Sequence, residues 1–476
     1  MFINGKIEEP TATNFQRHDP VTGDVASTMP DASDADVDRA IEAASKAFPA
    51  WSSTTPGERR TVLMKAADKL ESRTDEFVKV GIAETGATGS WIGFNVSFAA
   101  SLLREAAAMT TQIKGEIIPS NKPGSLAMAM RQPVGVLVGM APWNAPIILG
   151  VRAVALPLAC GNTVVLKASE ICPRLHQMIG ECLCDAGLVD GALNVVTHSA
   201  ERAPSVVARL IEHPKVMRIN FTGSTRVGKI VASLAAPHLK PVLLELGGKA
   251  PLIVLDDADL DAAVKAAAFG SFMNQGQICM STERIIVDEK VADAFVQKLS
   301  EKAASLPSGN PRENVVLGAL YDIKSTRHVS ELIDKAVAQG AKITAGGASD
   351  STIMAATVVD MVEQEMDLFH EETFAPVVCV TRARNSEHAI ELANDTIYGL
   401  SAAVFGSDIN RTLDVAKRIE SGICHINGPT VFDEGQMPFG GMKQSGYGRF
   451  GGMAGIDAFT ELRWVTIENP KQHYPF

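Results

Sequence analysis

The sequence predicts an α/β protein whose strands form parallel sheets. Three short β-branched runs, at residues 163–166, 216–221 and 252–255, are each followed by a stretch with helical periodicity. Strands that alternate with helices are joined by crossover connections, which bring the strands together in parallel. The composition, with 46% hydrophobic and 21% charged residues, is that of an ordinary globular protein.

Amphipathic helices are expected at residues 34–50 and 59–70, where apolar side chains recur at helical spacing. The second half of the chain repeats this pattern, with a strand at residues 282–288 and helices near residues 291–305 and 329–339. The same alternation of elements therefore runs through both halves.

The length of 476 residues, at roughly 150 residues per domain, predicts two or three domains. Two breaks in the pattern mark candidate boundaries. One is the run Leu-Gly-Gly-Lys-Ala-Pro at residues 246–251, after which a new strand–helix unit begins. The other lies near residues 427–429, before a glycine-rich stretch at residues 438–452.

Charge and cysteine usage exclude several classes of partner. The net charge of −11 argues against nucleic acid or an anionic membrane, because both bind basic surfaces. Of the seven cysteines, the closest pair is Cys182 and Cys184, which has no second pair or histidine at zinc-site spacing, so neither a disulfide framework nor a metal is expected. A reducing, cytoplasmic compartment fits best, and the amino-terminal residues contain no apolar run of the kind that a signal peptide needs.

Residues 132–151 carry no charge, which raises the question of a membrane span. The segment contains Pro133, Pro142 and Pro146, and a lipid-exposed helix would leave backbone groups unpaired at such positions. A buried strand at residues 134–140, a tight loop and then a helix is the better interpretation, so no membrane partner is expected.

The run Gly-Ser-Thr-Arg-Val-Gly-Lys at residues 223–229 lies between a predicted strand and a predicted helix. Glycines here let backbone N–H groups face a ligand, and the start of a helix favours an anion. The run nearly matches the P-loop of nucleotide-binding proteins, but Ile230 has no hydroxyl to hold Mg²⁺. The loop therefore indicates either a phosphate-bearing cofactor or a glycine-permitted turn.

Two further positions carry candidate chemistry. Glu245 ends an apolar strand, where desolvation would raise its pKa and suit a general base, with a salt-bridged structural glutamate as the alternative. Cys279 follows a polar, glycine-bearing loop at residues 274–278, whereas the other cysteines sit mostly in apolar or helical contexts that favour packing. An ordinary thiol is only a few per cent ionised at neutral pH, so a nucleophilic Cys279 needs a base or backbone amide dipoles to activate it.

Seven segments in order resemble the aldehyde dehydrogenase superfamily over nearly the whole chain. Any one of them is weak, but the full set, with the cysteine 34 residues after the glutamate, is specific. The segments are Ala-Pro-Trp-Asn at 141–144, Lys-Ala-Ser-Glu at 167–170, Phe-Thr-Gly-Ser-Thr at 221–225, Leu-Glu-Leu-Gly-Gly-Lys at 244–249, Gly-Gln-Ile-Cys at 276–279, Glu-Thr-Phe-Ala-Pro at 372–376, and Pro-Phe-Gly-Gly-Met-Lys at 438–443 with Ser-Gly at 445–446.

The resemblance implies a catalytic set of Cys279, Asn144, Glu245 and Lys167. Cys279 attacks the aldehyde carbon, and the resulting oxyanion is held by the Asn144 side chain and the Cys279 backbone N–H. Hydride transfer to a nicotinamide leaves a thioester, and Glu245 activates the water that hydrolyses it.

The resemblance also implies a dinucleotide site. Lys167 and Glu170 bind the adenosine ribose, Glu372 holds the nicotinamide ribose and Phe374 packs near the nicotinamide. The carboxylate of Glu170 repels a 2′-phosphate and favours NAD, while the neighbouring Lys167 leaves NADP open. The expected contacts are Ala141, Trp143, Lys167, Glu170, Phe221, Gly223, Ser224, Leu246, Glu372 and Phe374.

The implied architecture is an aldehyde dehydrogenase-like fold with a Rossmann-like cofactor domain, an α/β catalytic domain and a small β element for oligomerisation. A homodimer or homotetramer is expected. The expected divisions are residues 1–113 with 132–245 for the NAD-binding domain, 246–445 for the catalytic domain, and 114–131 with 446–476 for the bridging element.

A helical stripe and one buried charge are the substrate signals. Trp91, Phe94, Asn95 and Phe98 lie on one helix face, which core packing would explain as well as substrate binding does. The resemblance places this helix beside the substrate tunnel. Arg152 lies in an otherwise apolar helix, and a buried guanidinium needs either a protein carboxylate or a substrate oxygen as its partner.

The chain is most similar to bacterial aromatic aldehyde dehydrogenases of the salicylaldehyde, vanillin and benzaldehyde type. The hypothesis is an aromatic aldehyde stacked among Trp91, Phe98 and Tyr447, with Arg152 near its ring hydroxyl or shaping the tunnel. The complete expected substrate set is Trp91, Asn95, Phe98, Ala145, Arg152 and Tyr447.

Three alternatives stay open beside this hypothesis. An aliphatic aldehyde or a semialdehyde would change only the substrate. A CoA-acylating dehydrogenase would pass the thioester to coenzyme A, although Glu245 favours hydrolysis. An inert structural or binding homologue is the alternative of a different class, against which the joint presence of Cys279, Glu245, Asn144 and Lys167 argues.

Overall fold

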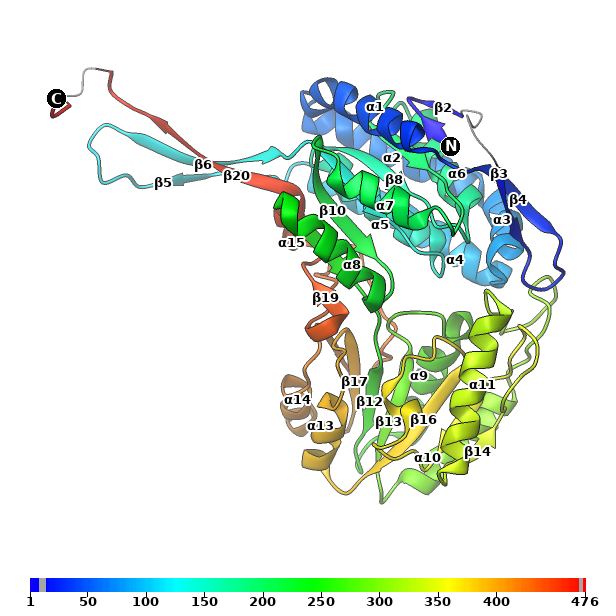
Figure 1. Cartoon of the computed structure of the whole chain (residues 1–476). Helices are drawn as coiled ribbons and strands as arrows, with labels where there is room; N and C mark the ends of the chain where they lie inside the picture. The colour runs from blue at the N-terminus through cyan, green and yellow to red at the C-terminus, as the bar shows by residue number, and fades with distance from the viewer. Residues whose placement is uncertain (8–13, 471–473) are drawn as a thin grey trace.

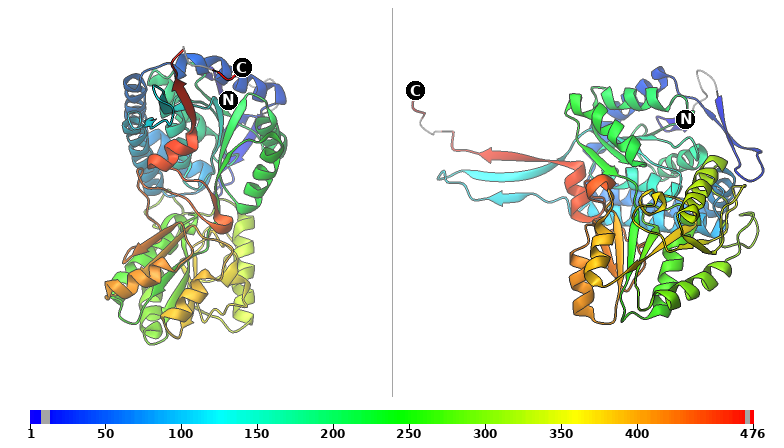
Figure 2. Two further views of the ribbon diagram at one scale, coloured as in Figure 1. Left: turned by 90° about the vertical axis from the view of Figure 1, so that its left-hand side faces the viewer. Right: turned by 60° about the horizontal axis from the view of Figure 1, so that its bottom comes forward.

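Two large sheets organise the chain, and a third, small sheet leaves the body of the molecule as an arm (Figures 1 and 2). The computed structural model describes residues 1–7, 14–470 and 474–476. Two short ranges lie outside the described residues. Residues 8–13 belong to the predicted NAD-binding segment and to the amino-terminal end for which no signal peptide is expected. Residues 471–473 belong to the predicted bridging segment.

The first sheet has eight strands within the described ranges. The strands from β11 to β9 run parallel, and antiparallel pairs close both edges. The α/β class predicted from the alternation of strands and helices is therefore confirmed. The strand order is β19 (Gly446–Tyr447), β11 (Val242–Glu245), β10 (Val216–Thr222), β7 (Val136–Met140), β8 (Thr163–Lys167), β9 (Leu193–Val196), β1 (Phe2–Ile3) and β2 (Lys6–Ile7).

Helices cover both faces of this sheet. Successive side chains of a strand point to opposite faces, so each strand contributes to the core on both sides. Val136 and Val138 of β7 pack into one core cluster, and Leu137 between them packs into another. The first cluster contains residues of α1 (Asp34–Ser52), α7 (Ala203–Glu212) and α8 (Thr225–Ala235). The second contains residues of α2 (Pro56–Ser72), α3 (Thr74–Thr85), α4 (Gly89–Met109), α5 (Pro146–Ala159) and α6 (Pro173–Asp185).

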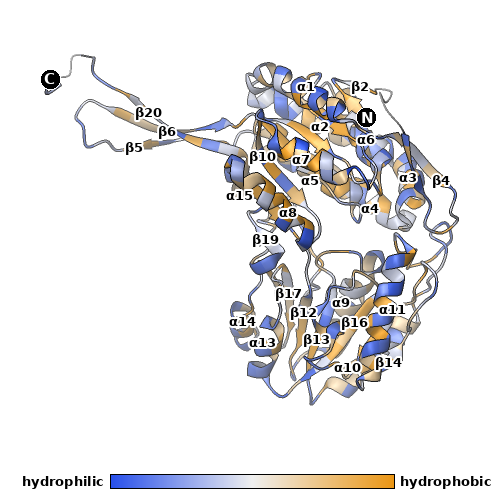
Figure 3. Ribbon diagram, viewed as in Figure 1, coloured by the Kyte–Doolittle hydropathy of each residue, from blue (hydrophilic) through white to orange (hydrophobic). Residues whose placement is uncertain are grey.

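The second sheet repeats this plan with seven strands in the described part of the chain. Ile253 of β12 packs with α11, α13 and α14, whereas Leu252 and Val254 pack with α9 and α10. The strands of both sheets are largely hydrophobic in Figure 3, as expected when both faces are covered. The order is β14 (Lys342–Ala345), β15 (Thr357–Asp360), β16 (Val377–Ala383), β13 (Thr282–Asp288), β12 (Ala250–Val254), β17 (Ser401–Phe405) and β18 (Ile423–Ile426), with α9 (Leu260–Phe272), α10 (Ala292–Ala304), α11 (Ile323–Ala338), α12 (Asp367–His370), α13 (Ser386–Asn394) and α14 (Ile409–Lys417).

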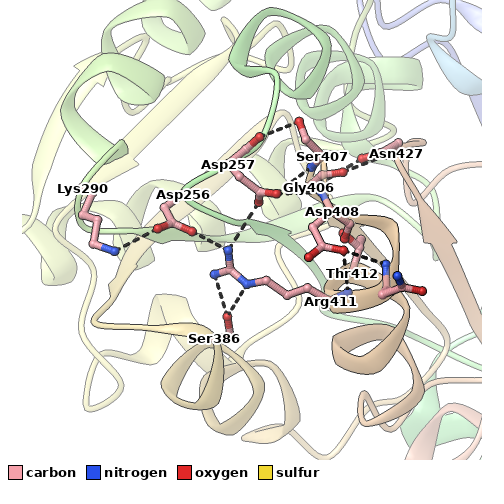
Figure 4. Close-up of polar contacts among 11 residues, drawn as sticks. Asp256, Asp257, Lys290, Ser386, Gly406, Ser407, Asp408, Arg411, Thr412 and Asn427 are labelled. Atoms are coloured by element: carbon pink, nitrogen blue, oxygen red, sulfur yellow. Dashed lines mark hydrogen bonds and ion pairs between the residues drawn. The ribbon is translucent and has the colours of Figure 1, made fainter.

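A network of charged and polar side chains joins the end of β12 to helices α13 and α14 (Figure 4). Asp257 accepts hydrogen bonds from the backbone N–H groups at the start of α14, including that of Asp408 at 2.7 Å. Arg411 donates to Asp256 at 2.6 Å and to Ser386 at 2.8 Å. The network is partly exposed and contains none of the motif residues, so we interpret it as structural.

The arm is an antiparallel sheet of β5 (Glu116–Ile118), β6 (Leu126–Pro133) and β20 (Thr460–Ile467). These strands fall within or overlap the segments expected to bridge subunits. The expected division differs from the structure between residues 446 and 459, because β19 pairs with β11 of the first sheet and α15 (Gly452–Phe459) packs against α5. A small hairpin of β3 (Asn14–His18) and β4 (Val25–Pro30) completes the elements.

The uncharged segment at residues 132–151 contains the end of β6, all of β7, a loop and the beginning of α5. This is the strand, loop and helix expected from its prolines and glycines. Among the described residues, no helix combines the length and the apolar character that a membrane crossing requires.

Candidate active site

The motif residues of the first half lie where parallel strands of the first sheet end. Residues 141–144 follow β7, Lys167 ends β8, Gly223 and Ser224 follow β10, and Glu245 ends β11. The carboxyl ends of parallel strands meet at one edge of a sheet, which is the usual location of a ligand site in such folds. The backbone N–H of Gly223 donates to the carbonyl of Glu245 at 2.9 Å and holds two of these ends together.

The motif residues of the second half precede strands of the second sheet. Cys279 lies just before β13, and Glu372 and Phe374 lie just before β16. Cavity-lining residues come from both groups, so the site lies between the carboxyl edge of the first sheet and the amino edge of the second.

A strained turn places Cys279. Asn274, Gln275 and Gly276 have φ angles of 49°, 55° and 68°, a left-handed run that only glycine adopts without cost. A Cβ at Gly276 would lie 2.0 Å from the carbonyl oxygen of Ala375, so this position also requires glycine for space. The Gln275 side chain donates to the carbonyl of Ala319 at 3.0 Å and helps to hold the strained backbone.

Asn144 is bound to this turn in both directions. Its side-chain Nδ2 donates to the carbonyl of Gln277 at 3.0 Å, and its own carbonyl accepts from Asn274 at 2.9 Å. Trp91 of α4 donates its indole N–H to the same carbonyl at 2.9 Å. The Asn144 amide is therefore fixed beside the cysteine loop, with a second amide proton available to a ligand.

A buried ion pair holds the turn that carries Glu372 and Phe374. Lys249 and Glu283 are almost fully buried and lie 2.7 Å apart. Glu283 also accepts the backbone N–H groups of Thr373 at 2.8 Å and Phe374 at 3.0 Å, and Phe374 has a φ of 50°. The pair therefore fixes a left-handed backbone position that would otherwise be unfavourable.

The start of α8 offers an anion site. Ser224 is the N-cap residue of this helix, and its side chain accepts the N–H of Val227. The helix begins at Thr225, so residues 225–229, most of which would form the loop of a P-loop motif, are helical here. Backbone N–H groups at a helix amino terminus favour a phosphate.

Two cavities meet at Cys279. The first has a volume of 240 Å³ and is lined by carboxylates and polar loops as well as by aromatic rings. Trp143 and Tyr321 lie in its wall with ring centroids 4.1 Å apart. Its lining includes Trp143, Asn144, Gly223, Ser224, Glu245, Leu246, Cys279, Tyr321, Glu372 and Phe374.

The second cavity has a volume of 450 Å³ and is mainly apolar. Asn144, Leu149 and Cys279 line both cavities, so the two spaces adjoin at the cysteine. Phe94 and Phe98 are stacked with their ring centroids 5.8 Å apart. The lining includes Trp91, Phe94, Phe98, Ala145, Arg152, Phe269, Phe432, Asp433 and Phe439.

The electrostatics of the junction favour neutral acids at rest. Burial raises the pKa of Glu245 to about 8, although Arg152 and Arg449 lower it. Neither carboxylate oxygen of Glu245 has a hydrogen-bond partner in the described part of the chain. Burial, and then the carboxylates of Glu245 and Glu372, raise the pKa of Cys279 above its usual range. A base must therefore take the thiol proton before the sulfur can act as a nucleophile.

Most predicted cofactor residues line the first cavity, and four do not. Lys167 and Glu170 lie together after β8, with Nζ and Oε2 3.8 Å apart. Burial would raise the pKa of Glu170, but Lys167 brings it below the usual value, so the carboxylate is charged at neutral pH. Ala141 and Phe221 are buried beneath the lining.

The predicted substrate residues separate in the same way. Trp91, Phe98, Ala145 and Arg152 line the second cavity. Asn95 and Tyr447, which were expected beside the substrate, do not line this cavity.

Asn95 is fully buried on the inner face of α4, where its amide donates to the carbonyl of Trp91 at 2.9 Å. Tyr447 pairs with Leu244 in the first sheet, and its side chain is half exposed. One member of the predicted helical stripe, Asn95, therefore belongs to the core. The position of Tyr447 is set by its pairing with Leu244 in the sheet.

Four residues outside the expected substrate set help to complete the second cavity. Phe94 belongs to the predicted stripe, and Phe439 lies inside a quoted motif, so both had a signal. Asp433 and Phe432 come from the loop after β18 and had none. Within the described ranges no cluster of three or more metal-ligating side chains is present.

Comparisons with known proteins agree with this arrangement. A vanillin dehydrogenase of Pseudomonas sp. (strain HR199 / DSM 7063) is 58% identical, over 100% of this chain and 99% of its own length. The crystal structure of a salicylaldehyde dehydrogenase from Pseudomonas putida G7, complexed with salicylaldehyde, superposes with a TM-score of 0.98 at 49% identity, covering 100% of this chain and 99% of that one. PnpE in complex with nicotinamide adenine dinucleotide superposes with a TM-score of 0.95 at 34% identity, covering 100% and 98%.

The two-sheet fold and the paired cavities define an α/β oxidoreductase of the dehydrogenase class. More particularly, the chain belongs to the aldehyde dehydrogenase family, whose family model matches residues 7–465.

Proposed function

We propose that the protein oxidises an aromatic aldehyde to the carboxylic acid with NAD(P), through a covalent intermediate on Cys279. The observation that carries this proposal is the position of Cys279 at the junction of an aromatic-lined cavity and a cavity with carboxylates and a helix amino terminus. The second cavity suits the aldehyde, and the first cavity suits a dinucleotide.

Cys279 performs the first step of the proposed reaction. Its sulfur forms a bond to the aldehyde carbon, and the carbonyl oxygen becomes the oxyanion of a thiohemiacetal. Asn144 lines both cavities and has an amide proton available for this oxygen. Glu245, in the same cavity, is the base that can take the thiol proton.

The lining of the first cavity fits a dinucleotide. The start of α8 favours a pyrophosphate, the Glu372 carboxylate can accept ribose hydroxyls, and Phe374 and Trp143 provide flat apolar surfaces. The Glu372 side chain fits here because residue 247 is glycine. A Cβ at Gly247 would lie 2.5 Å from Glu372 Oε2. Glu372 and Phe374 would hold the nicotinamide nucleotide here, and it would supply the hydride acceptor that converts the thiohemiacetal into a thioester.

Glu245 first releases the thiol proton to solvent and then performs the last step, in which it removes a proton from the water that attacks the thioester carbon. The thioester bond breaks, the carboxylic acid leaves, and Cys279 regains its thiol. The unpaired oxygens of Glu245 favour this role over a salt bridge. They also favour hydrolysis over transfer of the acyl group to coenzyme A.

The adenosine end of the cofactor is assigned to Lys167 and Glu170. The charged Glu170 would repel a 2′-phosphate, so we propose NAD as the preferred cofactor, with NADP as the alternative. Values of kcat/KM with both cofactors test this preference, and a clear advantage for NADP would contradict it.

The aromatic rings of the second cavity and the names of the relatives support an aromatic substrate. Kinetics across benzaldehydes and short aliphatic aldehydes test the proposal. We expect benzaldehydes to have the higher kcat/KM, because ring stacking and burial of apolar surface stabilise them in this cavity. A higher value for short aliphatic aldehydes or semialdehydes would overturn the substrate class, and the absence of any cofactor reduction would support an inert homologue.

The arm supports a homo-oligomer. Ile117, Leu462 and Trp464 on its strands are 74%, 60% and 76% exposed, and a monomer would leave these apolar side chains in water. We therefore propose that residues 114–131 and β20 form the bridging element of a homodimer or homotetramer. The rest of the chain forms the proposed cofactor domain and the proposed catalytic domain. The seven cysteines have no disulfide partner in the structure, which fits the proposed cytoplasmic compartment.

A further inference from the structure

A buried ion pair interrupts the apolar wall of the second cavity. Arg152 of α5 donates to Asp433 Oδ2, and the two side chains are only 7% and 13% exposed. The guanidinium carbon of Arg152 lies 4.5 Å from the ring centroid of Phe439. Both charged residues line the cavity in which we place the aldehyde. The guanidinium that the sequence singled out therefore has a protein carboxylate as its partner.

Of the two carboxylate oxygens of Asp433, Oδ2 accepts from Arg152 and Oδ1 is left for another donor. Asp433 Oδ1 is buried and has no hydrogen-bond partner in the described part of the chain. A buried carboxylate oxygen without a donor is unfavourable, and most such oxygens in folded proteins have a partner. The wall therefore contains one acceptor that lacks a donor, on a residue that lines the substrate space.

The charges around this oxygen select the kind of donor. Arg152 and Asp433 cancel each other, so the pair as a whole does not attract an anion such as the carboxylate of a semialdehyde. An ammonium group would have to lose its hydration in a mainly apolar cavity, which is costly. A neutral hydroxyl group can donate one hydrogen bond to Oδ1 at a much smaller desolvation cost.

We propose that Asp433 Oδ1 accepts the hydrogen bond of a hydroxyl group on the aromatic ring, so that the substrate is a hydroxylated benzaldehyde. This inference rests on the proposed function and adds a recognition residue to it. Arg152 then acts as a positioning residue, which orients the Asp433 carboxylate and leaves Oδ1 to the substrate.

Matched substrates test the proposal directly. The pairs are 3-hydroxy- with 3-methoxybenzaldehyde and 4-hydroxy- with 4-methoxybenzaldehyde, and unsubstituted benzaldehyde is the reference. Hydroxyl and methoxy groups donate electrons to the ring in similar ways, but only the hydroxyl can donate a hydrogen bond. Initial rates of cofactor reduction, below the phenol pKa of each substrate, give kcat/KM for each aldehyde.

In the unaltered enzyme, at least one hydroxyl compound should exceed its methoxy partner by about 10- to 150-fold, the usual value of a hydrogen bond to a charged group. In Asp433→Asn the amide oxygen faces Arg152 and the NH₂ group replaces Oδ1, so the acceptor becomes a donor. The hydroxyl-to-methoxy ratio should then fall to one or below. In Asp433→Ala it should fall towards one.

Glu434→Gln is the matched control. Glu434 is the next residue of the same loop but does not line the aldehyde cavity, and its carboxylate accepts from Gln436. This variant should keep the hydroxyl-to-methoxy ratio of the unaltered enzyme. Thermal unfolding and activity on benzaldehyde show whether each Asp433 variant is folded.

The outcomes separate the two proposals. If the unaltered enzyme does not oxidise benzaldehydes at all, the proposed function fails. If it oxidises benzaldehyde and the ratio is the same before and after Asp433→Asn, the proposed function stands and the role of Asp433 is wrong. Faster turnover of the ionised phenol, lost in Arg152→Met, would identify Arg152 as the ligand and would also overturn the inference.

Discussion

Asn144 donates its side-chain amide to the main-chain carbonyl of Gln277 at 3.0 Å, two residues before the candidate nucleophile Cys279. This bond joins the carboxyl edge of the first sheet to the loop that enters the second. Together with the bond from Asn274 to the Asn144 carbonyl, it holds the oxyanion donor beside the loop of the nucleophile.

Asn144→Ala removes the proposed oxyanion donor. We expect kcat to fall by about 10²–10³, because such a donor stabilises charge that develops in the transition state. Steady-state kinetics with benzaldehyde provide the measurement. Asn144→Asp is the control for shape, and it should also fail because a carboxylate repels the oxyanion. An alanine variant within threefold of the unaltered kcat would exclude this role.

Glu245→Gln tests the two proton transfers that we assign to this residue. Loss of a general base typically costs about 10²–10⁴ in rate. Because Glu245 is the proposed base for the thiol as well as for the water, steady-state turnover should fall by this factor, and rapid mixing should show that cofactor reduction in the first turnover is slowed as well. A full equivalent of reduced cofactor formed at the unaltered rate in the first turnover would contradict the role of Glu245 as the thiol base.

The pH dependence follows from the same residue. A base works only when deprotonated, and burial raises the pKa of Glu245 to about 8, so kcat should rise as the pH rises through about 8. The pKa of Glu372 is also raised to about 8 by burial and by Glu283. The kcat profile of Glu372→Gln should therefore keep its rising limb. A profile that is flat between pH 6 and pH 9 would contradict the assignment.

Glu283→Gln tests the buried pair that supports the cofactor side. The change leaves Lys249 buried without a counter-charge, and breaking one partner of such a pair costs about 3–5 kcal/mol of folding stability. Denaturant unfolding measures the loss. NAD affinity should fall as well, because Glu283 holds the backbone of Phe374. Glu289→Gln, an exposed glutamate just after β13, should change neither quantity.

The arm gives a prediction about assembly. Trp464→Glu places a charge on an apolar strand that is exposed in one chain and that we expect to be covered in the oligomer. Sedimentation should show dissociation towards monomers at micromolar concentration. Asn121→Glu, at an exposed position on the connection between β5 and β6 at the tip of the same arm, adds the same single charge and is the control for a change of charge alone. An unchanged oligomer in Trp464→Glu would place the interface elsewhere.

Sequence reasoning recovered what periodicity and motifs encode. The parallel strands followed from β-branched runs, and Cys279, Glu245 and Asn144 followed from motifs that lie at strand ends. The left-handed turn at Asn274 and Gln275 could not be predicted, because non-glycine residues seldom adopt that conformation.

The substrate side was harder to predict because it depends on contacts between distant parts of the chain. Arg152 and Asp433 are 281 positions apart, and no local pattern links them. Asn95 shares a helix stripe with Trp91 yet faces the core, and Tyr447 follows a motif yet lies on a sheet edge. Spacing along one helix could indicate a face but not which of its members reach the cavity.

Replacement of the nucleophile tests the central claim most directly. The measurement is cofactor reduction by Cys279→Ala with benzaldehyde, together with NAD binding by the same variant. We expect NAD to bind as before and turnover to be lost, since no other described cysteine lines either cavity. A variant that oxidised benzaldehyde at the unaltered rate would contradict the covalent mechanism.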